Sequence, residues 1–246
     1  MKVLSIGNSF SQDAQRYLHG IARADHTEMR AVNLYIGGCS LEQHAQNLHD
    51  DAKAYSLELN GETSGFSVSI REALCSQVWD AVTIQQASHF STKYATVQPF
   101  AGELAKEIRS LCPGARLLVH ETWAYEEGSE RLTQMMGYRK AEDMFHDLHA
   151  VYRRMAREVS ADGIIPAGTL LFDLAGKIGK VHRDTFHASL GAGRAALGLL
   201  WYHRLTGSPI GENPFSDFDE PVTERERSLI VQAVNALDEM EIMNKM

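Results

Sequence analysis

The chain has 246 residues, of which 44% are hydrophobic and 23% charged, so it can bury a core of ordinary size for one α/β domain. Its formal net charge is -8 at pH 7 and it contains no basic run, which argues against nucleic acid as a partner. No apolar stretch approaches the length of a membrane span, and the three cysteines are scattered without Cys-x-x-Cys spacing, which indicates reduced thiols.

The chain enters its first strand pattern directly, with no charged and then apolar leader before it. As it stands, the sequence predicts a soluble, cytoplasmic protein, and removal of a leader would instead make it secreted or periplasmic. We expect residues 1–246 to form a single domain.

The first strand pattern ends on a Gly-Asn-Ser sequence. Residues 3–6 have the character of a buried strand, Gly7 and Asn8 break it, and apolar positions at helical spacing follow over residues 14–22, with Ser11 as the expected N-cap. Ser9 would therefore lie at the carboxyl end of a strand and close to a helix N-terminus. Open α/β sheets bind ligands at this edge, and a helix N-terminus stabilises a developing negative charge.

Strand and helix patterns alternate along the rest of the chain, which predicts a mainly parallel sheet of five strands with helices on both faces. The four further strands are expected at 32–36, 79–84, 117–119 and 164–166. Asn60-Gly61 indicates an inserted hairpin or ordered loop over residues 55–68. Two capping-box patterns mark helix starts: Ser69-x-x-Glu72 predicts a short helix, and Thr223-x-x-Glu226 predicts a final helix over residues 222–243.

Several strand ends carry groups that a serine hydrolase needs. Gly38 can offer an unobstructed backbone N–H, and Gln85 or Gln86 can offer a side-chain amide. Asp184 and His187 are three residues apart in an irregular segment, so the carboxylate can orient the imidazole and leave its other nitrogen free to take a proton. In a parallel sheet, these strand ends share one edge with Ser9.

These blocks resemble the SGNH, or GDSL-type, hydrolase superfamily, and most closely a branch described mainly as a domain of unknown function. The first block matches at Ile6-Gly7-Asn8-Ser9-Phe10-Ser11, the second at Gly38, and the last at Asp184 and His187, followed by Ala188-Ser189-Leu190-Gly191. The resemblance implies a flavodoxin-like three-layer sandwich and metal-free ester hydrolysis, often of acetyl groups on carbohydrates. It makes Ser9 the nucleophile and, with Gly38, a backbone donor to the oxyanion.

One block departs from the superfamily pattern. Where the superfamily has Gly-x-Asn-Asp after the third strand, this chain has Ile84-Gln85-Gln86-Ala87-Ser88, and either glutamine can supply the missing amide. After the next strand, Trp123 and Tyr125 either stack on a sugar ring or pack under the following loop. Glu121 is either a substrate contact or a buried hydrogen-bond partner.

Two functions follow as hypotheses. The first is a serine esterase without metal or cofactor, acting on a short acyl group of a carbohydrate or similar small molecule. The second is a non-catalytic carbohydrate-binding or regulatory protein on the same scaffold, which the missing Gly-x-Asn-Asp block favours. A reactive Cys39 thiol is less consistent with the sequence, because a small buried free cysteine is the commoner role. A metal site at His146 and His149 is also less consistent, because no further ligands converge on them.

Overall fold

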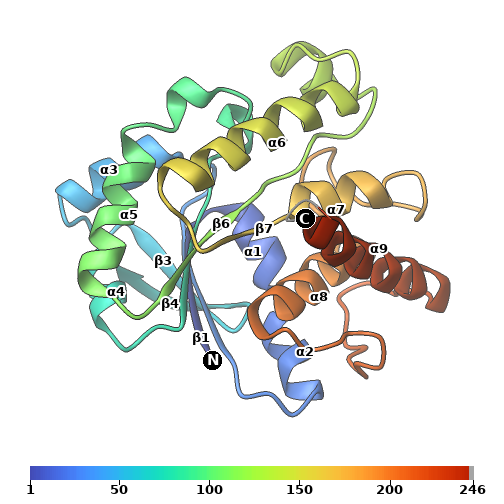
Figure 1. The fold of residues 1–246 in the computed structure, drawn as a ribbon, viewed down its shortest axis with the longest axis horizontal. Coiled ribbons are helices and arrows are strands. Elements are labelled where there is room, and N and C mark those ends of the chain that lie inside the picture. The colour runs from blue at the N-terminus through green and yellow to red at the C-terminus, as the bar shows by residue number, and fades with distance from the viewer. Residues whose placement is uncertain (244–246) are drawn as a thin grey trace.

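A computed structural model describes residues 1–243 as an α/β fold around one mostly parallel sheet (Figure 1). The sheet has seven strands in the order β4-β3-β2-β1-β5-β6-β7. Their bounds are β1 Lys2–Gly7, β2 Arg30–Tyr35, β3 Tyr55–Leu59, β4 Glu62–Val68, β5 Ala81–Ile84, β6 Arg116–His120 and β7 Gly163–Ile165.

The five strands expected from the sequence are present and parallel to one another, but the predicted strand count of five is wrong. The segment at 55–68 forms the hairpin β3–β4, which adds two antiparallel strands to the edge of β2. Asn60 and Gly61 both have positive φ, at 54° and 86°, and this is the backbone that a tight two-residue hairpin turn requires. The hairpin extends the sheet because the hydrogen-bonding edge of β2 was still open.

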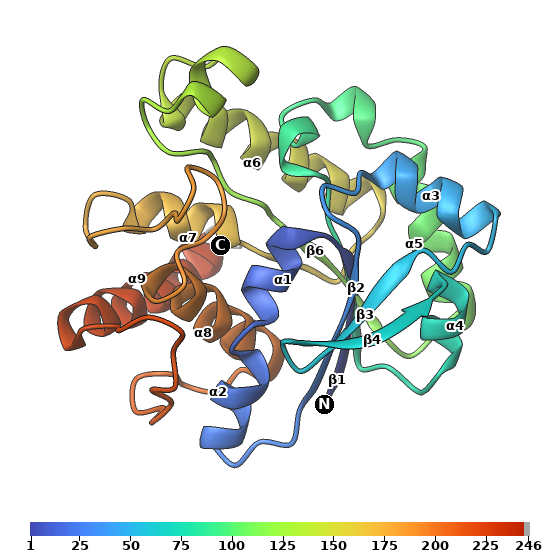
Figure 2. The same cartoon turned by 180° about the vertical axis from the view of Figure 1, so that it is seen from behind.

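Helices cover both faces of the sheet (Figures 1 and 2). Along the chain they are α1 Ser9–Gln15, α2 Leu18–Ala24, α3 Leu41–His49, α4 Ile70–Cys75, α5 Phe100–Leu111, α6 Ala141–Glu158, α7 Ala167–Leu174, α8 Ala192–Thr206 and α9 Glu224–Met243. Helices α3 to α6 lie on one side of the sheet. On the other side, α1 and α2 pack on α8, and α9 packs outside α7 and α8.

The helix starts show how local sequence determines these boundaries. Asn8, rather than Ser11, is the N-cap of α1, and Ser11 completes a capping box with it. The predicted capping boxes at Ser69 and Thr223 are both present, so α9 begins at Glu224, close to the expected position. The single helix predicted after Ser9 is divided into α1 and α2 near Tyr17.

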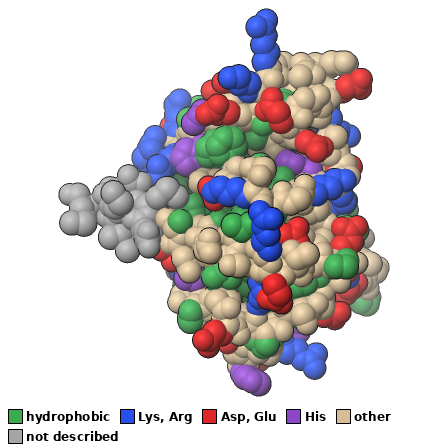
Figure 3. All heavy atoms as spheres, turned by 90° about the vertical axis from the view of Figure 1, so that its right-hand side faces the viewer, with side chains coloured by type: hydrophobic (Ala, Val, Ile, Leu, Met, Phe, Trp, Pro, Cys, Tyr) green, Lys and Arg blue, Asp and Glu red, His purple; other side chains and the backbone are tan. Residues whose placement is uncertain are grey.

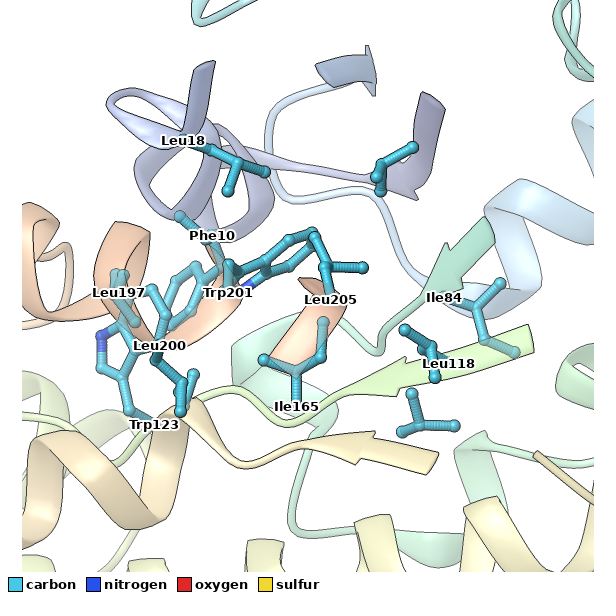
Figure 4. Packing of buried hydrophobic residues seen from close by; sticks show 14 of the residues in the cluster. Phe10, Leu18, Ile84, Leu118, Trp123, Ile165, Leu197, Leu200, Trp201 and Leu205 are labelled. Atoms are coloured by element: carbon cyan, nitrogen blue, oxygen red, sulfur yellow. The ribbon is translucent and has the colours of Figure 1, made fainter. Parts of the chain in front are cut away.

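The core on the α8 side of the sheet is built from large side chains (Figure 4). Phe10 of α1 stacks on Trp123, with ring centroids 4.2 Å apart, and Trp201 of α8 is fully buried. Burial of side chains of this size stabilises the fold by about 2 kcal/mol each. This packing fixes the start of α1 against the segments that follow β6.

The outer surface carries charges of both signs. On the face turned toward the viewer in Figure 3, acidic and basic side chains are interspersed with small hydrophobic areas. No helix among residues 1–243 is long and apolar enough to cross a membrane.

Candidate active site

Ser9 lies where β1 passes into α1, at the carboxyl end of the central strand. Gly7 leaves no room for a side chain, because a Cβ there would lie 2.1 Å from the Ser11 Oγ. The Asn8 side chain accepts a hydrogen bond from the Phe10 N–H at 3.0 Å, which makes Ser9 the first residue of the helix. The positive end of the helix dipole is therefore at the Ser9 hydroxyl.

A chain of buried hydrogen bonds ties this junction to the neighbouring strand ends, and we call Asn8, Gln85 and His120 the strand-end network. The Gln85 amide donates to the Asn8 Oδ1 at 2.7 Å, and the Gln85 Oε1 lies 2.6 Å from the His120 Nδ1. Burial lowers the pKa of His120 to about 3, so its ring is neutral and donates through Nδ1. The Asn8 amide also donates to the Cys39 carbonyl at 3.1 Å, next to Gly38.

Ser9, His187 and Asp184 form a continuous hydrogen-bonded line, although Ser9 and His187 are 178 positions apart. The Ser9 Oγ is 2.8 Å from the His187 Nε2, and the His187 Nδ1 is 2.8 Å from the Asp184 Oδ2. The His187 backbone N–H also donates to the Asp184 Oδ1 at 2.9 Å. Partial burial acts to raise the pKa of Asp184, but these hydrogen bonds from His187 outweigh it and the pKa is lowered, which keeps the carboxylate ionised.

The loop that carries Asp184 and His187 is fastened to α1 by an ion-pair cluster of Asp13, Arg183 and Arg194. Asp13 is fully buried, and its Oδ1 is 2.8 Å from the Arg183 Nη1 and 2.9 Å from the Arg194 Nε. Its Oδ2 accepts the Ala188 backbone N–H at 3.1 Å. Asp13 follows Ser9 by four positions on α1, so the same helix positions the serine and the loop that meets it.

A cavity of about 290 Å³ opens beside the Ser9 hydroxyl, and we call it the Ser9 cavity. Ser9 and Gly38 both line it, and neither backbone N–H donates a hydrogen bond within residues 1–243. Two donors without an intramolecular partner therefore border the space beside the serine. The lining residues are Asn8, Ser9, Phe10, Tyr35, Gly37, Gly38, Ser88, His89, Tyr125, Arg131, Met135, Phe186 and His187.

The two glutamines predicted as oxyanion donors do not line the Ser9 cavity, which corrects that prediction. Gln86 is fully buried, and its amide donates to the Thr96 carbonyl at 2.8 Å, away from Ser9. Gln85 is also buried, and its amide donates to Asn8. Sequence placed both residues after the right strand, but their long side chains reach inward to neighbouring backbone and side chains.

Burial decides between the two roles that the sequence left open for Glu121 and for Trp123, which follow β6. Glu121 is 1% exposed and is a hydrogen-bond partner, accepting from the Thr169 N–H in the first turn of α7 at 2.9 Å and from His149 at 2.7 Å. Trp123 is 1% exposed, and its indole N–H donates to the Phe186 carbonyl at 2.7 Å. Neither side chain lines the Ser9 cavity, so the predicted substrate contacts at these two positions are corrected to packing roles.

Tyr125 is both packed in the interior and part of the wall of the Ser9 cavity. It is largely buried and its hydroxyl lies 2.9 Å from the Ser88 Oγ, but both residues line the Ser9 cavity. Its ring packs edge-on against Phe186, with centroids 5.6 Å apart, so it is not free to stack on a sugar ring. A substrate-binding role for Tyr125 stays a prediction, and it would be a contact with the part of the side chain that lines the cavity.

Sequence reasoning missed several residues around the site. Asn8 was predicted only to break the first strand, and no role was predicted for Asp13. His89 and Arg131 line the Ser9 cavity from loops whose course the sequence does not determine. The available signal was the Asp13 spacing of four from Ser9, since an acid one turn after a catalytic serine points to the same side of the helix.

The other reactive groups considered from sequence lie elsewhere. Burial raises the pKa of the Cys39 thiol to about 12, so it is not a nucleophile at neutral pH. His149 is paired with Glu121, whereas His146 lies 3.8 Å from Glu142 on the surface of α6. Within residues 1–238, no group of three or more His, Cys, Asp or Glu side chains is arranged to hold a metal ion.

The fold is that of the SGNH and GDSL-type hydrolases. A putative SGNH hydrolase from Slackia heliotrinireducens has a TM-score of 0.56 at 22% identity, covering 82% of this chain and 97% of the other. TesA has a TM-score of 0.52 at 17% identity, covering 85% and 99% of the two chains. At these low identities, the TM-scores show a shared fold alone.

The chain belongs to the family described as a domain of unknown function, DUF4886, whose profile matches residues 2–236. A solved DUF4886 family protein from Bacteroides uniformis ATCC 8492 is similar over nearly the whole length, with a TM-score of 0.89 at 33% identity, covering 96% of this chain and 94% of the other. No curated protein sequence matches the chain significantly.

Proposed function

We propose that this protein is a serine hydrolase that cleaves a carboxylic ester of a small molecule, with Ser9 as nucleophile, His187 as general base and Asp184 as its orienting acid. The observation that supports it most is the 2.8 Å separation of the Ser9 Oγ and the His187 Nε2, because a base must lie within hydrogen-bond reach of the proton it takes. The likeness in fold to SGNH and GDSL-type hydrolases is consistent with this chemistry.

In the first half of the proposed reaction, His187 takes the Ser9 proton as the Oγ attacks the ester carbonyl. The tetrahedral oxyanion is stabilised by the backbone N–H groups of Ser9 and Gly38 and by the dipole of α1. His187 then gives its proton to the leaving alkoxide, which departs as an alcohol and leaves an acyl group on Ser9. In the second half, His187 deprotonates a water molecule that attacks the acyl-enzyme, and the acid and free serine are released.

The size of the Ser9 cavity favours a short acyl group such as acetyl, since about 290 Å³ lies at the small end of ligand sites. A carbohydrate or similar small alcohol is the proposed acceptor, because the cavity mixes aromatic rings with a few polar groups. Tyr35 and Phe186 supply apolar wall, and Ser88 and His89 supply hydrogen-bonding groups.

The test is hydrolysis of p-nitrophenyl acetate by the parent and by Ser9→Ala. The proposal expects turnover by the parent and only the buffer rate for the variant, and it expects a fluorophosphonate probe to label Ser9. Equal rates for both proteins would contradict the esterase proposal and favour a non-catalytic binding protein. Labelling at another residue would mean that the nucleophile is wrong.

A further inference from the structure

The Ser9 cavity has an unusual distribution of charge for a chain with 32 acidic and 24 basic residues. Among its lining residues there is one arginine, Arg131, and no aspartate or glutamate. Asp184 lies behind His187 and is not part of the wall. The Arg131 guanidinium is therefore the one permanently charged group in the lining of the cavity.

Arg131 is held at the cavity by an aromatic contact. Its guanidinium carbon lies 3.9 Å from the centroid of the Phe186 ring, and Phe186 immediately precedes His187. A planar guanidinium that stacks on a ring keeps its N–H groups at the edge free to bind a second partner. Stacking also reduces the number of positions that the long side chain can take, so less entropy is lost on binding.

No carboxylate of residues 1–238 forms a salt bridge with Arg131, although arginines elsewhere in the molecule do so, as at Arg16, Arg71 and Arg183. The charge of Arg131 also acts on the cavity wall, because it is one of the groups that lower the pKa of Tyr125, whose overall shift is upward owing to burial. Arg131 comes from the segment between β6 and α6, which projects beyond the sheet at the top of Figure 1.

The other nitrogen groups of the cavity wall add no negative charge to offset the Arg131 guanidinium. Burial, with the nearby Lys93 charge, lowers the pKa of His89, so this ring is neutral at pH 7 and can donate or accept a hydrogen bond. The backbone N–H groups of Ser9 and Gly38 add partial positive charge. A guanidinium, N–H donors and no carboxylate together make a site that attracts an anion and repels a cation.

We propose that the ester cleaved at Ser9 carries an anionic group, a carboxylate or a sulfate, and that Arg131 binds this group as the specificity-determining residue. The inference rests on the proposed hydrolase function and extends it to a class of substrate. A carboxylate or sulfate accepts two N–H groups from one guanidinium, and such charge-assisted pairs are stronger than neutral hydrogen bonds. The ester itself remains beside Ser9, so the charge lies on either the acyl or the alcohol part.

Two matched pairs of esters test the proposal, with the charge placed on each side of the ester bond. For the alcohol side the pair is 4-acetoxybenzoate and 4-acetoxybenzamide, and for the acyl side it is mono-4-nitrophenyl adipate and 4-nitrophenyl hexanoate. The measured quantity is the ratio of kcat/KM for the anionic ester to that for the neutral one. We expect Arg131→Gln to lower this ratio about tenfold for at least one pair.

The matched control is Arg139→Gln, which removes the same charge from an exposed position outside the Ser9 cavity. It should keep the ratio of the parent, and Arg131→Lys should keep part of it. Ratios that differ by less than twofold between the parent and Arg131→Gln, for both pairs, would overturn the proposal.

A binding measurement separates this proposal from the hydrolase function. Calorimetry with the non-ester analogues 4-acetamidobenzoate and 4-acetamidobenzamide, on the parent and on Arg131→Gln, needs no turnover. Preferential binding of the anionic analogue that depends on Arg131 would support the anionic site even if no ester were hydrolysed. Equal binding of both analogues by the parent would contradict the anionic site even if the protein were an active esterase.

Discussion

Ser9 and His187 meet from two regions that are held in different ways. On the serine side, the strand-end network of Asn8, Gln85 and His120 consists of neutral, buried groups at the carboxyl ends of three adjacent strands. On the histidine side, an irregular loop is fastened by the ion pairs of Asp13 with Arg183 and Arg194. The serine position therefore depends on the sheet, and the histidine position depends on charges brought together by tertiary folding.

The loop also contains backbone strain that the strand ends lack. Thr185, between Asp184 and Phe186, has a φ of 73°, in the left-handed region that a β-branched residue rarely adopts. Such a conformation costs on the order of 1 kcal/mol and persists only where surrounding contacts enforce it. The Thr185 carbonyl accepts the Glu126 N–H at 2.8 Å, and the hydrogen bonds from His187 to Asp184 and the Asp13 ion pair hold the residues on either side.

The largest effect is expected at the point where the two regions meet. Ser9→Ala removes the nucleophile and leaves both supporting networks intact, so kcat for an ester should fall by about 10⁴-fold or more while the melting temperature stays close to that of the parent. Stopped-flow or plate-reader kinetics and a thermal melt measure the two quantities. A variant that retains a tenth of the parent rate would show that the reaction does not pass through Ser9.

The next effect is expected from Asp13→Asn, which keeps the shape of the side chain but removes its charge. Two arginines lose a buried partner, so we expect a loss of about 3 kcal/mol in the free energy of unfolding. The displaced loop should lower kcat about 100-fold, since a shift of the base by about 1 Å has this effect.

Asp219→Asn is the matched control for this prediction. Asp219 also pairs with Arg194, at 2.8 Å, and with Arg16, at 2.7 Å, but it forms no hydrogen bond or ion pair with residues 183–187. It should reduce stability modestly and leave kcat within about twofold of the parent. If both variants reduced kcat equally, Asp13 would act through general stability and not through the loop.

A smaller effect on rate is expected from Gln85→Leu on the serine side. The change removes the link between Asn8 and His120 without altering the ion pairs, so kcat should fall about tenfold through a less well fixed Ser9. Gln86→Leu breaks contacts to Leu41 and Thr96 instead and should affect stability more than rate. A larger loss of kcat in Gln86→Leu would restore Gln86 as an oxyanion donor.

The buried histidines and the Asp184 carboxylate should respond to acid at different pH. Burial lowers the pKa of His44 and of His120 to about 3, against about 6.5 for an unfolded histidine, so between these values only the unfolded chain binds the protons. Stability should therefore fall as the pH decreases from 6.5 toward 3, by about 1.4 kcal/mol per pH unit for each histidine. Denaturant melts at pH 7, 6 and 5 measure this slope.

Asp184 titrates in a lower range. Its pKa is lowered in the folded state, so its contribution is present above about pH 4 and is lost only below that value. His44→Asn and His120→Asn should each reduce the dependence of the unfolding free energy on pH, between pH 6.5 and 5, by about 1.4 kcal/mol per pH unit. Asp184→Asn should leave that dependence unchanged. An unchanged slope in both histidine variants would show that these rings are not kept neutral by the fold.

Much of the fold could be predicted because its signals are local. Alternating strand and helix patterns indicated the five parallel strands, and the capping boxes at Ser69 and Thr223 marked helix starts correctly. The hairpin at 55–68 was recognised from Asn60-Gly61, but its addition to the sheet was not. A turn signal determines that two strands pair with each other. Which strand of the sheet they then pair with depends on which strand has an unpaired hydrogen-bonding edge in the folded structure.

For the site, the amino-acid sequence alone determined the position of Ser9 at a strand-to-helix junction and the pairing of Asp184 with His187, because each depends on neighbours within a few positions. Only the tertiary structure decided the inward direction of Gln85 and Gln86, the burial of Trp123, and the attachment of the loop through Asp13. It also brought Arg131 to the cavity. These features depend on which long side chains find partners in the folded interior, and that choice is made between residues far apart in the chain.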